Sequence, residues 1–110
     1  MLIKFTARHY KAPKKLKDYA EAEVKKLKKY SDGIIECEII LDYEKSIQIA
    51  EISAKVNHQR LFAMEKSEDV YKSIDLAVEK LLRQLKKHKE KLQSHSSKDS
   101  SDLIVPTSIT

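Results

Sequence analysis

The most regular hydrophobic pattern in the chain lies between Ser67 and Leu92. Apolar residues recur there at steps of three, four or seven, which gathers their side chains into one stripe on a helix of 3.6 residues per turn. The stripe consists of Val70, Ile74, Val78, Leu81, Leu85 and Leu92. We therefore predict an amphipathic helix whose apolar stripe packs against another layer of structure, such as a sheet.

The same predicted helix carries a second row of side chains, about half a turn away from the apolar stripe. Its members are all basic and follow one another at steps of three, four and four: Lys80, Arg83, Lys87 and Lys91. Residues at this spacing lie on one side of a helix. The helix is thus expected to present one face to the core and a cationic face to solvent.

Alternation with a period of two predicts four strands. They cover residues 2–9, 35–44, 50–56 and 60–66, with a connecting turn at 45–48 and a second turn at 57–59. The inward-facing side chains are expected to be Ile3, Phe5, Ala7, Ile35, Cys37, Ile39, Leu41, Tyr43, Ala50, Ile52, Ala54, Val56, Leu61 and Ala63. Phe62 and Met64 are expected to face outward, and the outward side of the second strand is largely acidic.

Another helix is predicted from about Pro13 to Tyr30, where a proline suits the first helical turn. Its apolar face consists of Leu16, Ala20, Val24 and Leu27. Gly33 is expected to end this helix in the left-handed C-cap conformation, and Ser67 to cap the start of the last helix. The predicted order is β-α-β-β-β-α, an α+β fold in which both helices pack on one face of a four-stranded sheet.

A chain of 110 residues suffices for one domain with one core. We place this domain at residues 1–93. Residues 94–110 begin with a serine-rich segment without aliphatic side chains and are predicted to form a flexible tail.

Charge is segregated along the chain, whose formal net charge is +5. Residues 11–30 hold eight basic residues against three acidic ones, and residues 80–91 hold six against one. Residues 31–56 hold six acidic residues against two basic ones. Two basic helices on one side of a sheet, with acidic residues on its other side, favour a polyanionic partner such as RNA or DNA.

The sequence offers little support for catalysis or for a bound metal. No nucleophile, base and orienting group form a recognisable catalytic motif. The candidate metal ligands do not stand at metal-binding spacing; they are His9, Cys37, His58, His88 and His95. We expect no enzyme activity, cofactor or metal. A single cysteine and the absence of a long apolar run favour a cytosolic protein without a membrane partner.

Three segments resemble a known family. They are A-R-H near the start, V-K-K-L-K-K-Y-S-D at the end of the first helix, and V-Y-K-S-I-D-L-A-V-E-K-L-L-R-Q-L-K-K-H-K-E-K-L in the last helix. Together with the order of elements, they resemble the ribosome hibernation promoting factor and ribosome-associated inhibitor family of bacteria. The resemblance implies a fold similar to a double-stranded RNA-binding domain. It also implies binding to the small ribosomal subunit between head and body, at the decoding region. There such proteins overlap the tRNA and mRNA paths and inhibit translation under stress.

The resemblance and the basic rows together indicate a set of residues that contact ribosomal RNA. These residues are Arg8, Lys25, Lys26, Lys28, Lys29, Lys80, Arg83, Lys86, Lys87, Lys89 and Lys91. Near the first helix the chain departs from residues common in the family, at Ala7, Pro13 and Glu23. Off the ribosome we expect a monomer.

Two other functions fit the residues alone. One is a general double-stranded RNA-binding module, and the other is a regulator whose basic face meets an acidic protein. The residues after Leu92 are too few for the second domain of the long members, and they do not clearly match the extension of the inhibitor type. The subtype within the family therefore stays open at this point.

Overall fold

The protein is described by a computed structural model that covers residues 1–97, with side chains as far as residue 88. Its elements are β1 (Leu2–Ala7), α1 (Lys14–Lys25), the 3-10 helix η1 (Lys26–Lys29), β2 (Ile34–Glu44), β3 (Ile47–Val56), β4 (Gln59–Ser67) and α2 (Val70–Ser97). Helix α2 thus continues four residues past the predicted domain boundary at 93. The remainder of the predicted tail, residues 98–110, lies outside the described residues.

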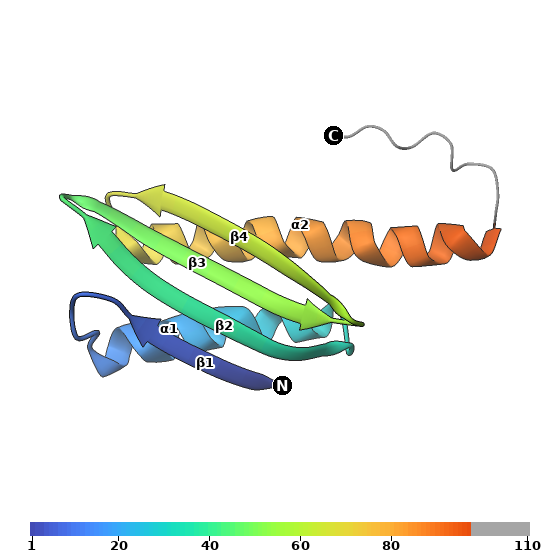
Figure 1. The fold of residues 1–110 in the computed structure, drawn as a ribbon, viewed down its shortest axis with the longest axis horizontal. Helices are drawn as coiled ribbons and strands as arrows, with labels where there is room; N and C mark the ends of the chain where they lie inside the picture. Colours follow the sequence, from blue (N-terminus) through green and yellow to red (C-terminus); the bar gives the residue numbers. More distant parts are fainter. Residues whose placement is uncertain (98–110) are drawn as a thin grey trace.

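The four strands form one sheet in the order β1-β2-β3-β4. Strand β1 runs parallel to β2, which requires a crossover connection, and α1 provides it. The other neighbours are antiparallel and are joined by short turns. Both helices lie behind the sheet and run in the same direction, and the C-terminal part of α2 extends past the strands (Figure 1). The predicted α+β fold, with two helices on one face of the sheet, is confirmed.

The core lies between the sheet and the two helices. From α2 it receives the central part of the predicted stripe, namely Ile74, Val78, Leu81 and Leu85, together with Ala77. Val70 is only partly buried and packs at the margin, while the side chain of Leu92 lies outside the described part. From α1 and η1 it receives Leu16, Ala20, Val24 and Leu27, as predicted.

The start of β2 differs from the predicted alternation. The pairing of β2 with β3 is irregular between Ile34 and Glu36. An extra residue at such an irregularity reverses the direction of the side chains on one side of it. Ile34 is therefore buried, whereas Ile35 is 58% exposed, so the prediction that Ile35 faces inward is wrong. At the other end of β2, Tyr43 keeps the alternation and meets the ring of Tyr10, but it lies at the end of the sheet and is 42% exposed.

Gly33 does not act as a left-handed C-cap, because its φ is not positive. Helix α1 instead tightens into η1, which ends at Lys29 and has Tyr30 as its C-cap residue, with right-handed backbone angles. Gly33 has little room for a larger side chain, because a Cβ atom at this position would lie 3.0 Å from Oδ1 of Asn57. Asn57 and His58 themselves have positive φ, as in the two-residue turns that suit the twist of a hairpin.

Ser67 does not cap α2. The helix begins two residues later than that assignment requires, and the Oδ1 atom of Asp69 accepts a hydrogen bond of 3.0 Å from the N–H of Tyr71. Asp69 is therefore the capping residue. Ser67 ends β4, and its hydroxyl lies 2.7 Å from the hydroxyl of Ser73.

Among the residues whose side chains are described, Ser73 is the fully buried polar residue of the core. Its hydroxyl donates a 2.7 Å hydrogen bond to the carbonyl oxygen of Gln48. We expect Ser73→Ala to lower the free energy of unfolding by about 1–3 kcal/mol, because it leaves this carbonyl without a buried partner. Urea denaturation measures the change. Ser46→Ala, in the exposed β2–β3 turn, is the control and should cost far less; equal losses for the two variants would contradict the assignment.

Candidate nucleic-acid interface

The basic ends of the two helices lie on the same side of the sheet. Because α1 and α2 run in the same direction, the lysines that follow α1 and those in the second half of α2 lie toward the same end of the molecule (Figure 1). The exposed cations of this helical surface are Lys25, Lys26, Lys28, Lys29, Lys80, Arg83, Lys86 and Lys87. Nζ of Lys86 lies 5.5 Å from the ring centroid of Tyr30, which links α2 to the end of η1.

Two tyrosines hold the helices together beside this surface. The hydroxyl of Tyr19 in α1 donates a hydrogen bond of 2.5 Å to Asp75 in α2, and its ring meets that of Tyr71 edge-on at 4.9 Å. The bond to the carboxylate raises the pKa of Tyr19 well above its usual value. Both rings are thus used for packing, whereas Tyr30 is 41% exposed.

The cationic row of α2 lies along the edge strand β4. Nζ of Lys80 is 3.6 Å from a carboxylate oxygen of Glu65, and Nε2 of Gln84 donates a 2.8 Å hydrogen bond to the carbonyl of Phe62. Both partners belong to β4. A shallow hollow of about 420 Å³ is lined by Lys80, Arg83, Gln84, Lys86 and Lys87. The row is therefore turned toward the open edge of the sheet, and Gln84, which the sequence did not indicate, anchors α2 there.

Some of these cations are engaged by local acids. Arg83 contacts Glu79 at 3.3 Å, and Lys26 contacts Glu23 at 2.9 Å. The hydrogen bond to Glu23 raises the pKa of Lys26. Exposed pairs of this kind are typically worth only about 0.2–1 kcal/mol. They are therefore weak enough to be exchanged for phosphate groups.

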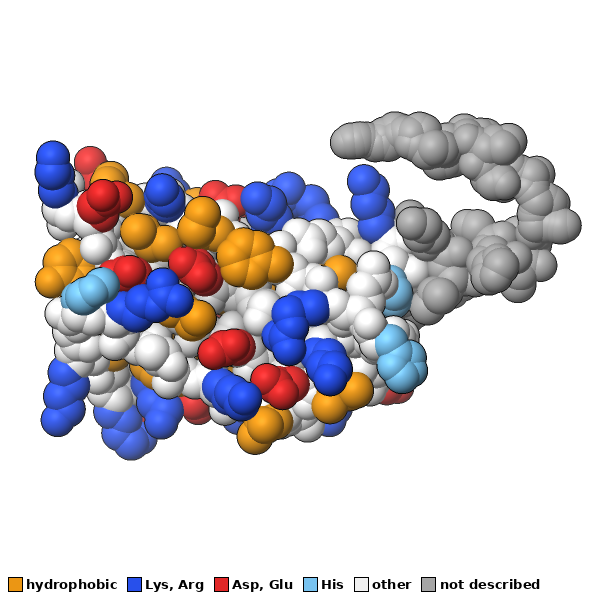
Figure 2. Space-filling model, viewed as in Figure 1, with side chains coloured by type: hydrophobic (Ala, Val, Ile, Leu, Met, Phe, Trp, Pro, Cys, Tyr) orange, Lys and Arg blue, Asp and Glu red, His pale blue; other side chains and the backbone are white. Residues whose placement is uncertain are grey.

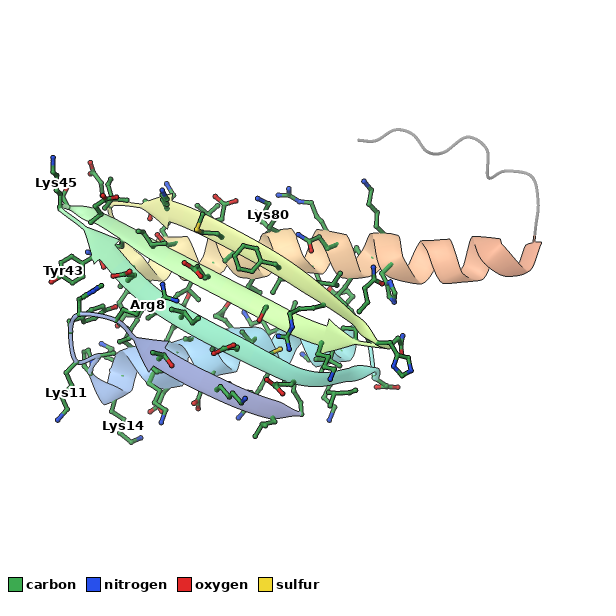
Figure 3. The ribbon with its side chains drawn as sticks, viewed as in Figure 1. Arg8, Lys11, Lys14, Tyr43, Lys45 and Lys80 are labelled. Carbon is green, nitrogen blue, oxygen red and sulfur yellow. The ribbon has the colours of Figure 1, made fainter. Side chains whose placement is uncertain are left out.

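Arg8 lies on the other face of the sheet, away from the helical surface (Figure 3). Its guanidinium is 3.8 Å from Glu51 and 4.0 Å from Asp42, and Lys4 similarly contacts Glu36. On this open face acidic and basic side chains are interleaved (Figure 2). The acids predicted there are present, but cations of β1 and its following loop partly neutralise them.

Asp42, on the open face, is expected to make the stability of the protein depend on pH. Nδ1 of His9 lies 2.9 Å from its carboxylate, and this contact is the main reason why the pKa of Asp42 is below its usual value. The hydrogen bond that the N–H of Tyr43 donates to the same carboxylate is the second cause. A lowered pKa in the folded state stabilises the protein above the unfolded value of about 3.9, and the contribution is lost as the pH falls through the folded value. Asp42→Asn should therefore lower the melting temperature at pH 7, and the difference from wild type should shrink below about pH 4. A difference that stays constant down to pH 2 would contradict this role.

The sequence profile of the family described as "Sigma 54 modulation protein / S30EA ribosomal protein" matches residues 3–93. The chain belongs to this family. The resemblance inferred from the three sequence segments is thereby confirmed.

Relatives of this S30EA family member include the ribosome hibernation promoting factors of Klebsiella oxytoca and Escherichia coli K12. They are 35% and 32% identical over 95 residues, which are 86% of this chain and the full length of each relative. Among solved structures, a ribosomal subunit interface protein of Coxiella burnetii is similar with a TM-score of 0.77, 28% identity and coverage of 82% of this chain and 99% of that one. The N-terminal domain of Protein Y from Thermus thermophilus gives a TM-score of 0.75 at 28% identity, covering 80% and 99%.

For two of the predicted contact residues of this S30EA protein, the structure describes only the backbone. Lys89 and Lys91 lie within α2, and their side chains are outside the described part. Eight of the predicted residues thus lie on the helices, four of them around the hollow beside β4 and the other four at the end of α1 and in η1. Helix α2 carries these two further ones, and Arg8 stands apart on the opposite face.

A second basic cluster lies at the opposite end of the S30EA fold, where β1 and β2 end. Lys11, Lys14 and Lys45 lie at that end, with Lys45 on one side of the exposed Tyr43 and the other two lysines on its other side (Figure 3). Lys14 is paired with Asp18 at 2.9 Å. Sequence spacing could not predict this grouping, because Lys45 belongs to the β2–β3 turn and comes to the same end of the molecule as the others only through the parallel pairing of β1 with β2.

The described part of the chain contains no group of three or more His, Cys, Asp or Glu side chains placed to hold a metal ion. Cys37 is buried, and burial raises the pKa of its thiol to about 11. A thiol with such a pKa is protonated at neutral pH and is a poor nucleophile. Among the described helices, none is both long and apolar enough to cross a membrane.

Proposed function

We propose that this chain is a ribosome hibernation factor, as its relatives are named. It binds the small ribosomal subunit at the decoding region, occludes the tRNA and mRNA sites, and inhibits translation under stress. It acts in the cytoplasm by steric occlusion, without catalysis or a cofactor, and it is a monomer when off the ribosome. The observation that carries the proposal is the helical surface, where two parallel helices place their basic ends side by side.

The chemistry of this surface suits folded RNA. Cations in rows along a helix neutralise successive phosphates and release counterions, which gives strong and salt-dependent binding. Arg83 adds a planar guanidinium that bonds phosphate oxygens in pairs. With Tyr19 and Tyr71 used for packing, the surface lacks a series of stacking rings, so recognition of shape and phosphates is favoured over a single-strand channel.

The residues proposed to contact ribosomal RNA are those of the helical surface, with Lys89 and Lys91 further along α2 and with Arg8. Arg8 reaches the RNA only if the subunit also contacts the open face of the sheet, because its guanidinium lies among Asp42 and Glu51. Its substitution is therefore expected to matter less than that of the α2 cations.

A competition assay on small subunits tests the proposed function. We expect the labelled chain to inhibit a purified translation system and to be excluded from subunits already loaded with mRNA and initiator tRNA. An excess of model RNA duplex should not displace it. Displacement by duplex at comparable concentration would instead indicate a general double-stranded RNA-binding module. Binding that survives nuclease digestion of the RNA would indicate an acidic protein partner.

A further inference from the structure

A cavity of about 250 Å³ opens at the C-terminal end of the helical surface. It lies between the η1–β2 connection, the β3–β4 turn and α2, and the side chains that matter most in it are Lys29, Tyr30, Asp32, Asn57, Leu85 and His88. Sites for drug-sized ligands usually measure about 300–1,000 Å³. The size of this cavity therefore fits one small planar group rather than a larger ligand.

His88 supplies the cavity with an unused polar atom. Its Nε2 is buried and has no hydrogen-bond partner among the described residues. Leaving a buried polar atom unsatisfied costs about 1–3 kcal/mol, and such atoms in folded proteins call for an explanation. His88 lines the cavity. A small rotation of its imidazole ring, which would turn Nε2 toward the cavity, would let a ligand there provide the missing partner.

The other walls offer a ring, an apolar side chain and cations. Tyr30 is 41% exposed, and its ring is already approached by Nζ of Lys86. Leu85, which is 2% exposed, presents an apolar wall, and Lys29 brings a positive charge to the rim. An aromatic ring beside an apolar wall and a rim cation together match a base that carries a phosphate.

Asp32 and Asn57 add polar groups that differ in kind. The carboxylate of Asp32 accepts hydrogen bonds, and the amide of Asn57 both donates and accepts them. Asn57 of the β3–β4 turn lies near Gly33 of the η1–β2 connection, and Asp32 and Asn57 both border the cavity. The edge of a nucleobase, with its own donors and acceptors, is complementary to such a mixed lining.

We propose that this cavity binds one unpaired nucleotide of the RNA, with its base between Tyr30 and Leu85 and its edge hydrogen-bonded to Nε2 of His88. This inference rests on the proposed function, and it adds a base contact to a surface that otherwise meets phosphates. It also assigns a role to Tyr30 beyond holding Lys86.

The imidazole signals of His88 test the cavity directly in the full-length protein. We expect the four ribonucleoside 5′-monophosphates, titrated one by one, to shift the His88 signals in NMR spectra, with at least one base preferred. Inorganic phosphate at the same concentration should leave them unchanged. The inference is overturned if phosphate shifts them as much as any nucleotide, or if no nucleotide shifts them.

Tyr30→Ala tests the same cavity on the ribosomal subunit, with Tyr43→Ala as a matched control. The two rings are 41% and 42% exposed but lie at opposite ends of the sheet. Losing one stacked base should weaken binding of the Tyr30 variant about tenfold, and the control should bind as wild type does. If wild type binds and both variants match it, the cavity proposal fails while the proposed function stands. If wild type does not bind the subunit, both fail.

Discussion

Replacing Arg83 and Lys87 by glutamate together is expected to abolish binding to the small ribosomal subunit. Both side chains are exposed on α2 and line the hollow beside β4. Each substitution removes an attraction to phosphate and adds a repulsion, and a unit charge pair at 4 Å is worth about 1 kcal/mol even in water. Because salt screens each of these interactions, we expect about a hundredfold loss of affinity near physiological salt. Fluorescence anisotropy with purified subunits measures it.

The control for this variant reverses two charges at the other end of the sheet. Lys45 and Lys66 are exposed, and changing both to glutamate alters the net charge of the protein by the same amount. If total charge alone governed binding, the two double variants would lose affinity equally. We expect the control to keep most of its affinity and both variants to keep the circular dichroism spectrum of wild type. Equal losses would remove the assignment of the site to the helical surface.

Leu81→Ala is expected to destabilise the fold strongly. Leu81 is fully buried in the core, where α2 packs over the sheet. Truncating a buried leucine costs about 2–5 kcal/mol, because apolar contacts are lost and a cavity remains. Domains of this kind are stable by only about 5–15 kcal/mol in total. Urea denaturation should therefore show a large drop in the midpoint.

Leu76→Ala is the matched control, because it is the same substitution in the same helix. Leu76 is only partly buried, so less apolar surface and less volume are lost from the packed interior. We expect its cost to be clearly smaller than that of Leu81→Ala. Comparable costs would contradict the predicted orientation of α2, in which the stripe through Leu81 faces the sheet.

Much of the fold was predictable because apolar residues recur at different spacings in its helices and its strands. Steps of three and four marked α2, and strict alternation marked β3, where Ala50, Ile52, Ala54 and Val56 are all buried as expected. Local detail at the ends of elements was less predictable. Ile35 turns outward because of an irregular pairing with β3, and this depends on the partner strand rather than on the sequence near Ile35.

The errors at Gly33 and Ser67 share a cause. Both residues have the right type for a cap, but tertiary contacts decide their use. Asn57 approaches Gly33 from the β3–β4 turn, and Ser73 engages the hydroxyl of Ser67 from the first turn of α2. Residue type alone therefore predicts a helix cap poorly where another element packs against that residue.

The candidate site was predictable where one helix carries it and unpredictable where several elements meet. The row through Lys80 and Arg83 followed from spacing alone. The separate position of Arg8 depends on the direction of the β1 side chains, and the cavity at His88 requires η1, the β3–β4 turn and α2 to come together. The charge of residues 80–91 was a usable signal for the surface, but no sequence signal marked the cavity.

Sedimentation with ribosomes through sucrose gradients at rising salt tests the central claim most directly. We expect the full-length chain to travel with the small subunit at low salt and to dissociate as the salt concentration rises, since phosphate contacts release counterions. The Arg83→Glu, Lys87→Glu variant should stay at the top of the gradient at every salt concentration. Absence of the wild-type chain from the small-subunit and ribosome fractions even at low salt would contradict the claim.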